Sequence, residues 1–105
     1  MENEIVKVFK SKDFGKIRTA IVNNEPWFVG KDVASCLAYK DTSDALKKHV
    51  DAEDKGVYLI DTLGGKQNVI IINESGLYHL LMRSEKMSAS KKQAFITSLQ
   101  KEGYL

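Results

Sequence analysis

The side chains best suited to binding chemistry lie close together, in residues 41–50. Thr42 and Ser43 carry hydroxyls, and Lys47 and Lys48 carry ammonium groups about one helical turn further along the chain. Hydroxyls and ammonium groups donate hydrogen bonds to phosphate oxygens and to the edges of bases. This segment is therefore a candidate surface for reading a nucleic acid.

A helix is predicted to present these side chains. Its start carries three residues whose side chains can accept hydrogen bonds from free N–H groups, namely Asp41, Thr42 and Ser43. Leu46 and Val50 lie four residues apart and are expected to face the core, which leaves the serine and lysine side chains on the outer face. The alternative is an ordinary solvated surface, because charged faces of helices usually have no ligand.

A first helix is predicted immediately before this one. Residues 27–29 form an apolar, β-prone run in which Trp27 is expected to be a core anchor, and Gly30 ends the run. From Lys31 onward, apolar residues recur at the spacing of a helix with one buried stripe: Val33, Ala34, Leu37 and Ala38. Two short helices joined by a tight turn are the arrangement of helix-turn-helix DNA readers.

Strand and turn patterns flank the two helices. Ile5–Phe9 and Ile17–Val22 predict an N-terminal hairpin that turns near Gly15. After a polar loop, Val57–Ile60 and Asn68–Ile72 predict a second hairpin.

The turn of the second hairpin is a candidate second contact with DNA. Gly64 and Gly65 let a backbone amide approach a phosphate closely, and Lys66 adds a positive charge. A hairpin that follows a helix-turn-helix often lies along the DNA backbone, so we expect Lys66 and Lys55 to contact phosphates. An ordinary connecting turn is an equally good interpretation, because Gly-Gly is common in hairpins that bind nothing.

Two further helices complete the predicted fold. Asn73 is expected to cap a core helix over Glu74–Arg83, and Ser88 or Ser90 to cap a last helix over Lys91–Gln100. At 105 residues the chain is expected to form one domain. The predicted class is α+β: a small antiparallel sheet with a helix-turn-helix-like pair, a β-hairpin wing and C-terminal helices.

Composition limits the choice of function. The net charge of +2 is far below that of domains which bind nucleic acid by charge alone, so any DNA contact must be local. No apolar run approaches the length of a membrane span, and the acidic N-terminus differs from a secretory signal. We therefore expect a cytoplasmic protein.

Few residues are available for metal, redox or catalytic chemistry. Cys36, the single cysteine, is expected to be a small, reduced core residue. His79 lies beside a buried stripe, where a hydrogen-bonded structural histidine is far more common than a ligand or base. A polar loop over Asp51–Gly56 accounts for the cluster of acidic residues. We expect no metal, no cofactor and no enzymatic activity.

Four blocks of sequence occur in a distinctive order: PWFVGKDVASCLAY, DALKKHV with DAEDKGV, DTLGGKQ, and IINESGLYHLLMRSE. Together they resemble the N-terminal domain of the BRO family (Bro-N), found in phage and prophage antirepressors and in proteins of large DNA viruses. The resemblance covers residues 5–86. It implies a DNA-binding module in the transcriptional control of phage genes, often followed by a separate C-terminal domain.

Two features depart from the family pattern. Ala38 stands where the family usually has glycine. If that position needs a positive φ, alanine costs about 1 kcal/mol, and the first helix is then expected to run on through Tyr39 instead. The last segment, SKKQAFITSLQKEGYL, replaces a longer basic segment, so the role of that segment cannot be transferred to Phe95, Ile96 and Leu99.

The leading hypothesis is binding of double-stranded DNA in the bacterial host cell. The residues expected to contact DNA are Thr42, Ser43, Lys47, Lys48, Lys55 and Lys66. The alternative is a protein-interaction module that binds a repressor without contacting DNA, which a net charge of +2 suits equally well. A homodimer is compatible with both functions.

Overall fold

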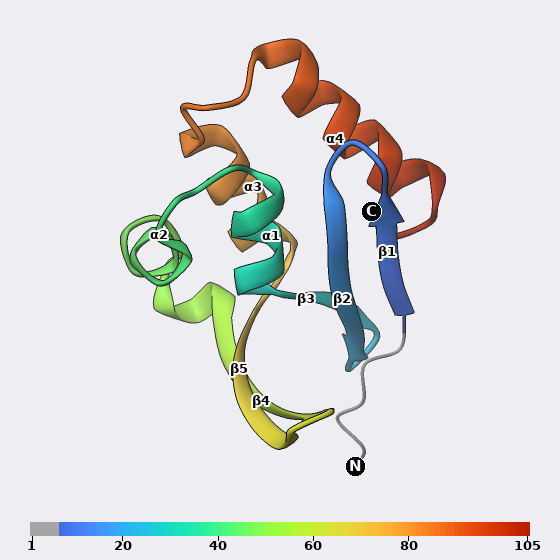
Figure 1. Ribbon diagram of the computed structural model, residues 1–105, viewed down its shortest axis with the longest axis vertical. Coiled ribbons are helices and arrows are strands. Elements are labelled where there is room, and N and C mark those ends of the chain that lie inside the picture. Colours follow the sequence, from blue (N-terminus) through green and yellow to red (C-terminus); the bar gives the residue numbers. More distant parts are fainter. Residues whose placement is uncertain (1–6) are drawn as a thin grey trace.

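The computed structural model describes residues 7–105, apart from the side chain of Thr62, and contains a five-stranded antiparallel sheet with helices packed on it (Figure 1). Its elements are β1 (Lys7–Ser11), β2 (Gly15–Val22), β3 (Glu25–Val29), α1 (Gly30–Cys36), α2 (Thr42–His49), a 3-10 turn (Ala52–Asp54), β4 (Lys55–Thr62), β5 (Gly65–Ile72), α3 (Glu74–Arg83) and α4 (Ala89–Lys101). The predicted α+β class is confirmed. The first two residues of the predicted Ile5–Phe9 strand lie outside the described residues.

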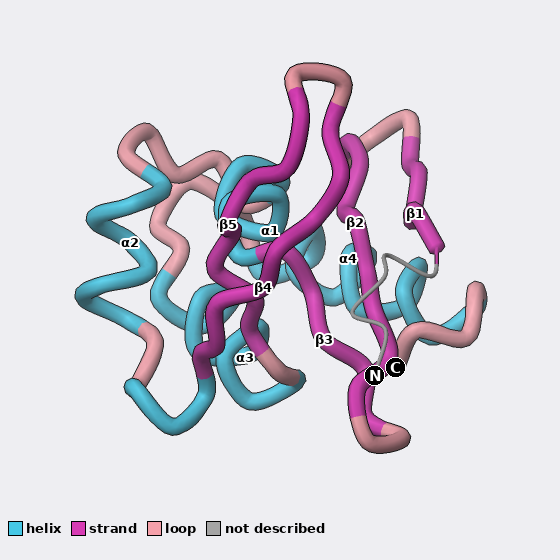
Figure 2. The backbone as a smooth tube through the Cα atoms, turned by 90° about the horizontal axis from the view of Figure 1, so that it is seen from below, coloured by secondary structure: helices cyan, strands magenta, loops and turns pink. Residues whose placement is uncertain are grey.

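The strand order β1-β2-β3-β5-β4 places a three-stranded meander beside the β4–β5 hairpin. The two parts join through a short pairing, in which Phe28 faces Ile72 and Val29 faces Ile71. Beyond Val29 the chain leaves the sheet to form α1, while β5 extends to its turn with β4. The predicted second hairpin is therefore present, and it projects beyond the rest of the sheet (Figure 2).

The helices lie on one face of the sheet; in Figure 2, α1 and α4 lie behind the strands and α2 lies to the left of β5. Side chains from that face and from all four helices form one core: Phe9, Ile17, Phe28, Val33, Ala34, Leu37, Ala45, Leu46, Val50, Ile72, Leu77, Leu80, Leu81, Phe95 and Leu99. Leu46 and the following Val50 are both buried, as expected from their spacing. In the described part of the chain, no helix is both long and apolar enough to cross a bilayer.

The aromatic anchor of β3 is Phe28, and the prediction for Trp27 is wrong. Phe28 is fully buried in the core, whereas Trp27 is only half-buried and lies opposite Ala20 of β2. Successive side chains of a strand point to opposite faces. Trp27 therefore lies on the face of the sheet that the helices do not cover.

α1 begins at Gly30, so this glycine starts the helix as well as ending the strand. A Cβ atom at this position would lie 2.8 Å from Leu46 Cδ2 and 3.3 Å from Ile72 Cγ2. Contacts of 2.8 Å between carbon atoms are repulsive, since the optimum is near 3.5–4.0 Å. The absence of a side chain at Gly30 thus lets α2 pack directly against the start of α1.

α1 ends before Ala38, which has a positive φ of 66°. The Tyr39 N–H donates to the Ala34 carbonyl at 3.0 Å, which closes the helix end around the left-handed residue. Ala38 is exposed and is not part of the buried stripe, and the helix does not run on through Tyr39. Alanine occupies the conformation that glycine adopts more easily.

The C-terminal helices are capped as expected. Asn73 Oδ1 accepts from the Gly76 N–H at 2.9 Å, and Ser88 Oγ accepts from the Lys91 N–H at 3.2 Å, so Ser88 and not Ser90 is the N-cap of α4. Phe95 and Leu99 are fully buried in the common core. The segment that departs from the family pattern is therefore an integral part of this fold.

Candidate nucleic-acid interface

α2 is capped by Asp41 alone among the three expected capping residues. Asp41 Oδ1 accepts from the Asp44 N–H, and the Asp41 carbonyl accepts from the Ala45 N–H, both at 3.0 Å. Thr42 and Ser43 consequently fall in the first turn of the helix. Their hydroxyls make no hydrogen bond to any other residue that the structure describes, and both are thus available to a ligand.

A groove separates the start of α2 from β5. Its volume is about 370 Å³, and its polar lining consists of Arg18, Lys31, Thr42, Ser43, Gln67 and Asn68. The groove exists because β3 ends at Val29, so that none of the strands in residues 7–105 lies between Gln67–Ile70 and the helices. Two predicted contact residues, Thr42 and Ser43, are thereby brought beside the hairpin.

Arg18 and Lys31 differ in how much charge they offer to this groove. Arg18 binds Asp32 through its Nε at 2.8 Å and its Nη2 at 2.9 Å, and its backbone N–H donates to the same carboxylate at 3.0 Å. The hydrogen bond to Asp32 raises the pKa of Arg18. Lys31 is exposed and has no ion-pair partner among the described residues, so it is the cation of the groove that a ligand can use.

The four predicted lysine contacts are placed differently. Lys47 is exposed and unpaired among the described residues, and it lies one turn after Ser43 on the same flank of α2. Lys48 Nζ lies 3.1 Å from Asp44 Oδ2, and Lys66 Nζ lies 3.2 Å from a carboxylate oxygen of Asp61. Exposed ion pairs such as these contribute little stability, so a phosphate can replace the carboxylate.

Lys55 is directed inward. Its Nζ donates to the Leu46 carbonyl at 3.4 Å, near the C-terminal end of α2, where a positive charge is favourable. It therefore helps to hold the helix, and the surface around it offers less free charge than the sequence suggested.

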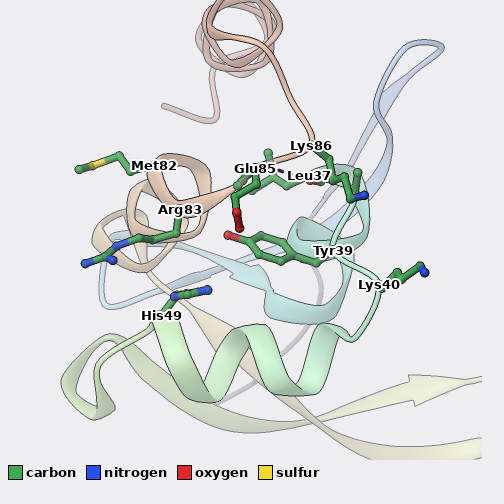
Figure 3. Close-up of a pocket in the computed structure, with 10 residues that line it drawn as sticks. Leu37, Tyr39, Lys40, His49, Met82, Arg83, Glu85 and Lys86 are labelled. Carbon is green, nitrogen blue, oxygen red and sulfur yellow. Dashed lines mark hydrogen bonds between the residues drawn. The ribbon is translucent and has the colours of Figure 1, made fainter.

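A second cavity, of about 490 Å³, lies on the other side of α2, between the α1–α2 turn and the end of α3 (Figure 3). Its basic residues are Lys40, His49, Arg83 and Lys86. The Tyr39 hydroxyl donates to the Leu80 carbonyl at 2.7 Å, which ties the α1–α2 turn to α3. Burial raises the pKa of Tyr39, and the charge of Glu85, which points toward the ring in Figure 3, adds to this shift.

Three further side chains lie close together, although nothing in their sequence spacing indicated it: Asp51, Asp54 and His79. One ligand atom from each lies within 4.8 Å of the others. Asp54 is nearly buried, and its oxygens accept from Asn73 Nδ2 at 3.1 Å and Ser75 Oγ at 3.2 Å, so it anchors the start of α3 and is not a polar loop residue.

His79 was expected to be a hydrogen-bonded structural residue, and this is wrong for its Nδ1 atom. Nδ1 is buried without a hydrogen-bond partner in the described chain and lies 3.8 Å from Asp54 Oδ2. The three side chains could ligate a cation, yet the hydrogen bonds of Asp54 account for its position without one.

The sequence patterns located the helix but missed half of the groove. Lys31, Gln67 and Asn68 line it beside Thr42 and Ser43. The available signal was the pair of polar residues Gln67 and Asn68 before an apolar strand, which resembles any hairpin flank. Their meeting with α2 depends on how β3 and β5 pair.

The sequence model of the family described as "BRO family, N-terminal domain" matches residues 16–102. The Bro-N domain-containing protein 289L of Invertebrate iridescent virus 6 is 40% identical over 88 residues, which covers 67% of this chain and 21% of that protein. An uncharacterized protein of Haemophilus influenzae is 30% identical over 97 residues, which covers 91% of this chain and 48% of that protein.

The chain spans less than half the length of the relatives it matches. No solved structure gives a significant match. The family description and the names of these relatives indicate no enzymatic family.

Proposed function

The chain belongs to the BRO family, as a member of its N-terminal domain family, and we propose that it binds double-stranded DNA through α2 and the β4–β5 hairpin. In this proposal the N-terminal part of α2 enters the major groove and the hairpin follows the DNA backbone. The module acts in the transcriptional control of phage genes, as part of an antirepressor in the cytoplasm of the bacterial host. The resemblance to antirepressor domains supports this setting.

The observation that carries the proposal is the groove between α2 and β5. It combines the hydroxyls of Thr42 and Ser43 with the amides of Gln67 and Asn68. Asparagine and glutamine side chains pair with adenine through two hydrogen bonds, and hydroxyls bind several base edges. Lys31 adds a positive charge in the same groove, so a small net charge is sufficient for a local contact.

The remaining predicted residues contribute around this groove. Ser43 and Lys47 share one flank of α2 and approach bases and phosphate together. Lys48 and Lys66 exchange their carboxylate partners for phosphates. Lys55 acts indirectly, because it holds the end of α2 in place.

Fluorescence anisotropy with a random-sequence DNA duplex at several salt concentrations tests the proposal. Each phosphate contact contributes a slope of about −0.9 in log affinity against log salt. Lys47→Ala should reduce the slope by about one contact, whereas Lys101→Ala, at an exposed lysine of α4, should leave it unchanged. A wild-type chain whose binding ignores salt would contradict the proposal.

Sequence preference tests the groove itself. Asn68→Ala should lower affinity for the preferred site by about 1–3 kcal/mol and leave binding to other sequences unchanged, because base contacts specify and phosphate contacts position. Lys66→Glu is the matched comparison on the same hairpin, and it should weaken binding to all sequences alike. If Asn68→Ala also weakens all sequences alike, Asn68 does not contact a base.

A second candidate function is binding to a repressor protein. The interactions that three of the predicted contact lysines make within the chain favour this function. Lys48 and Lys66 are held by carboxylates, and Lys55 is turned inward, which leaves little free charge for DNA. In that case Lys66→Glu should abolish binding to the repressor, while no duplex binds even at low salt.

A further inference from the structure

β4 is an edge strand, and among the described residues no other strand pairs with its outer side. It is eight residues long, and its register with β5 runs from Lys55 to Thr62 without a bulge. Proteins usually protect such an edge with central charges, proline or a bulge, because unpaired N–H and C=O groups recruit another strand. The centre of β4, residues 57–60, contains no charged residue and no proline.

The hairpin also exposes apolar side chains next to this edge. Val57 is 65% exposed and Leu59 is 49% exposed, and Ile70, which faces Val57 across the hairpin, is 39% exposed. The alternation of side chains in a strand places all three on one face. Exposed apolar side chains that lie together mark contacts with proteins, and Val57 and Leu59 belong to the open edge strand itself.

We propose that two copies of this chain pair through β4, antiparallel, around a two-fold axis that passes through Tyr58. This pairing joins the two sheets into one continuous sheet. Val57 then lies opposite Leu59 of the second copy, and Lys55 lies opposite Asp61 of the second copy. The edge is therefore self-complementary in both charge and apolar contact, as a two-fold interface requires.

The register follows from hydrogen bonding and charge. On an edge strand, every second residue points its N–H and C=O groups away from the sheet. In a symmetric pair, each of these outward-pointing residues must face an outward-pointing residue of the second copy. This is possible only if the two-fold axis passes through a residue and not between two residues. An axis through Val57 would place Asp61 opposite Glu53, and an axis through Leu59 would place Asp61 opposite Val57. Only an axis through Tyr58 places Asp61 opposite a lysine, which is Lys55 of the second copy.

The charges of the hairpin fit the same arrangement. Asp61 already lies 3.2 Å from Lys66 of β5. In the pair it is flanked by Lys66 on one side and, on the other, by Lys55 of the second copy, whose Nζ exchanges the Leu46 carbonyl, 3.4 Å away, for the carboxylate. The charges then alternate across three strands. Opposite charges on directly facing residues stabilise neighbouring strands.

Sedimentation velocity and light scattering test the pairing, and the inference does not depend on DNA binding. The 11.8 kDa chain should reach twice that mass as its concentration rises to about 1 mM. Leu59→Lys, at an exposed position, should give a folded monomer, as judged by circular dichroism. Ile21→Lys is the matched control, because Ile21 is 55% exposed on the interior strand β2. This variant should remain dimeric.

Charge reversal tests the register. Asp61→Lys and Lys55→Asp should each be monomeric alone, because each places like charges opposite each other. An equimolar mixture should form a heterodimer, in which every lysine again faces an aspartate. A wild-type chain that stays at 11.8 kDa, a dimeric Leu59→Lys variant, or a mixture that remains monomeric would each overturn the proposal.

Discussion

Ala38 adopts a backbone conformation that residues with a Cβ atom generally avoid. Its φ of 66° lies in the left-handed region, which costs a residue with a Cβ roughly 1–2 kcal/mol. The residue is exposed, so no packing offsets this cost. The cost is tolerated because the turn lets Tyr39 reach the carbonyl of Leu80 and Ser84 reach the carbonyl of Leu37.

We expect Ala38→Gly to stabilise the protein by about 1 kcal/mol, because glycine adopts a positive φ without strain. Urea unfolding followed by circular dichroism measures this. Ala94→Gly is the matched control: Ala94 is exposed in the middle of α4, where glycine should cost about 1 kcal/mol. Destabilisation by both substitutions would show that the turn does not require a positive φ.

Cys36 was expected in the core, but it is only half-buried against the edge of the core, and its thiol is protonated in the folded protein at neutral pH. Burial raises its pKa from the ordinary 9.0 to about 11, with a further contribution from the charge of Asp32, and its Sγ lies 3.8 Å from the Lys16 carbonyl. Only the thiolate is nucleophilic. At pH 8 the folded protein should therefore react with iodoacetamide about 100-fold more slowly than the urea-unfolded chain.

The same shift links stability to pH. Because the folded thiol holds its proton more tightly, its contribution to stability is present below pH 9 and is lost as the pH rises toward 11. Equal alkylation rates in the folded and unfolded chains would contradict the raised pKa.

At the scale of elements, α2 is positioned by what surrounds it more than by its own sequence. Gly30 lets it approach α1 closely, Leu46 and Val50 bury its inner side, and Lys55 bonds to its last turn. β5 then forms the opposite wall of the groove. A helix of eight residues has little stability alone, so these contacts define its orientation.

The family resemblance left the role of α4 open. Because its apolar side chains are buried in the core, we expect α4 to stabilise the fold. Leu99→Ala removes a fully buried side chain and should cost about 2–5 kcal/mol. Ile96→Ala, at a half-buried position of the same helix, should cost markedly less. Urea midpoints of the two variants give the comparison. Equal and small effects would mean that α4 is not docked on the sheet.

At the scale of the whole molecule, the β4–β5 hairpin serves two surfaces. The open side of β5 faces α2 and forms the groove, and the open side of β4 is the proposed contact between copies. A two-fold axis that joins two sheets into one must lie perpendicular to the joined sheet. The helices of both copies therefore lie on the same face of that sheet. The two proposals together imply that a dimer presents both α2 helices to one DNA duplex with two-fold symmetry.

Much of the fold was determined by the sequence, because its signals lie within a few residues. Asp41 and Asn73 cap helices through their own side chains, and the four-residue spacing of Leu46 and Val50 defines the inner side of α2. The order of strands and helices and the glycine turn of the second hairpin follow from the same kind of local pattern. Thr42 and Ser43 could be placed at the start of α2 for this reason.

Other features were decided only by tertiary structure, because they depend on partners distant in the chain. Alternation shows that Trp27 and Phe28 lie on opposite faces of β3, but only the packing of the helices selects the face of Phe28. The carboxylates beside Lys48 and Lys66 likewise depend on side-chain geometry. The groove itself arises where β3 ends and β5 continues, and this determines that Gln67 and Asn68 meet α2.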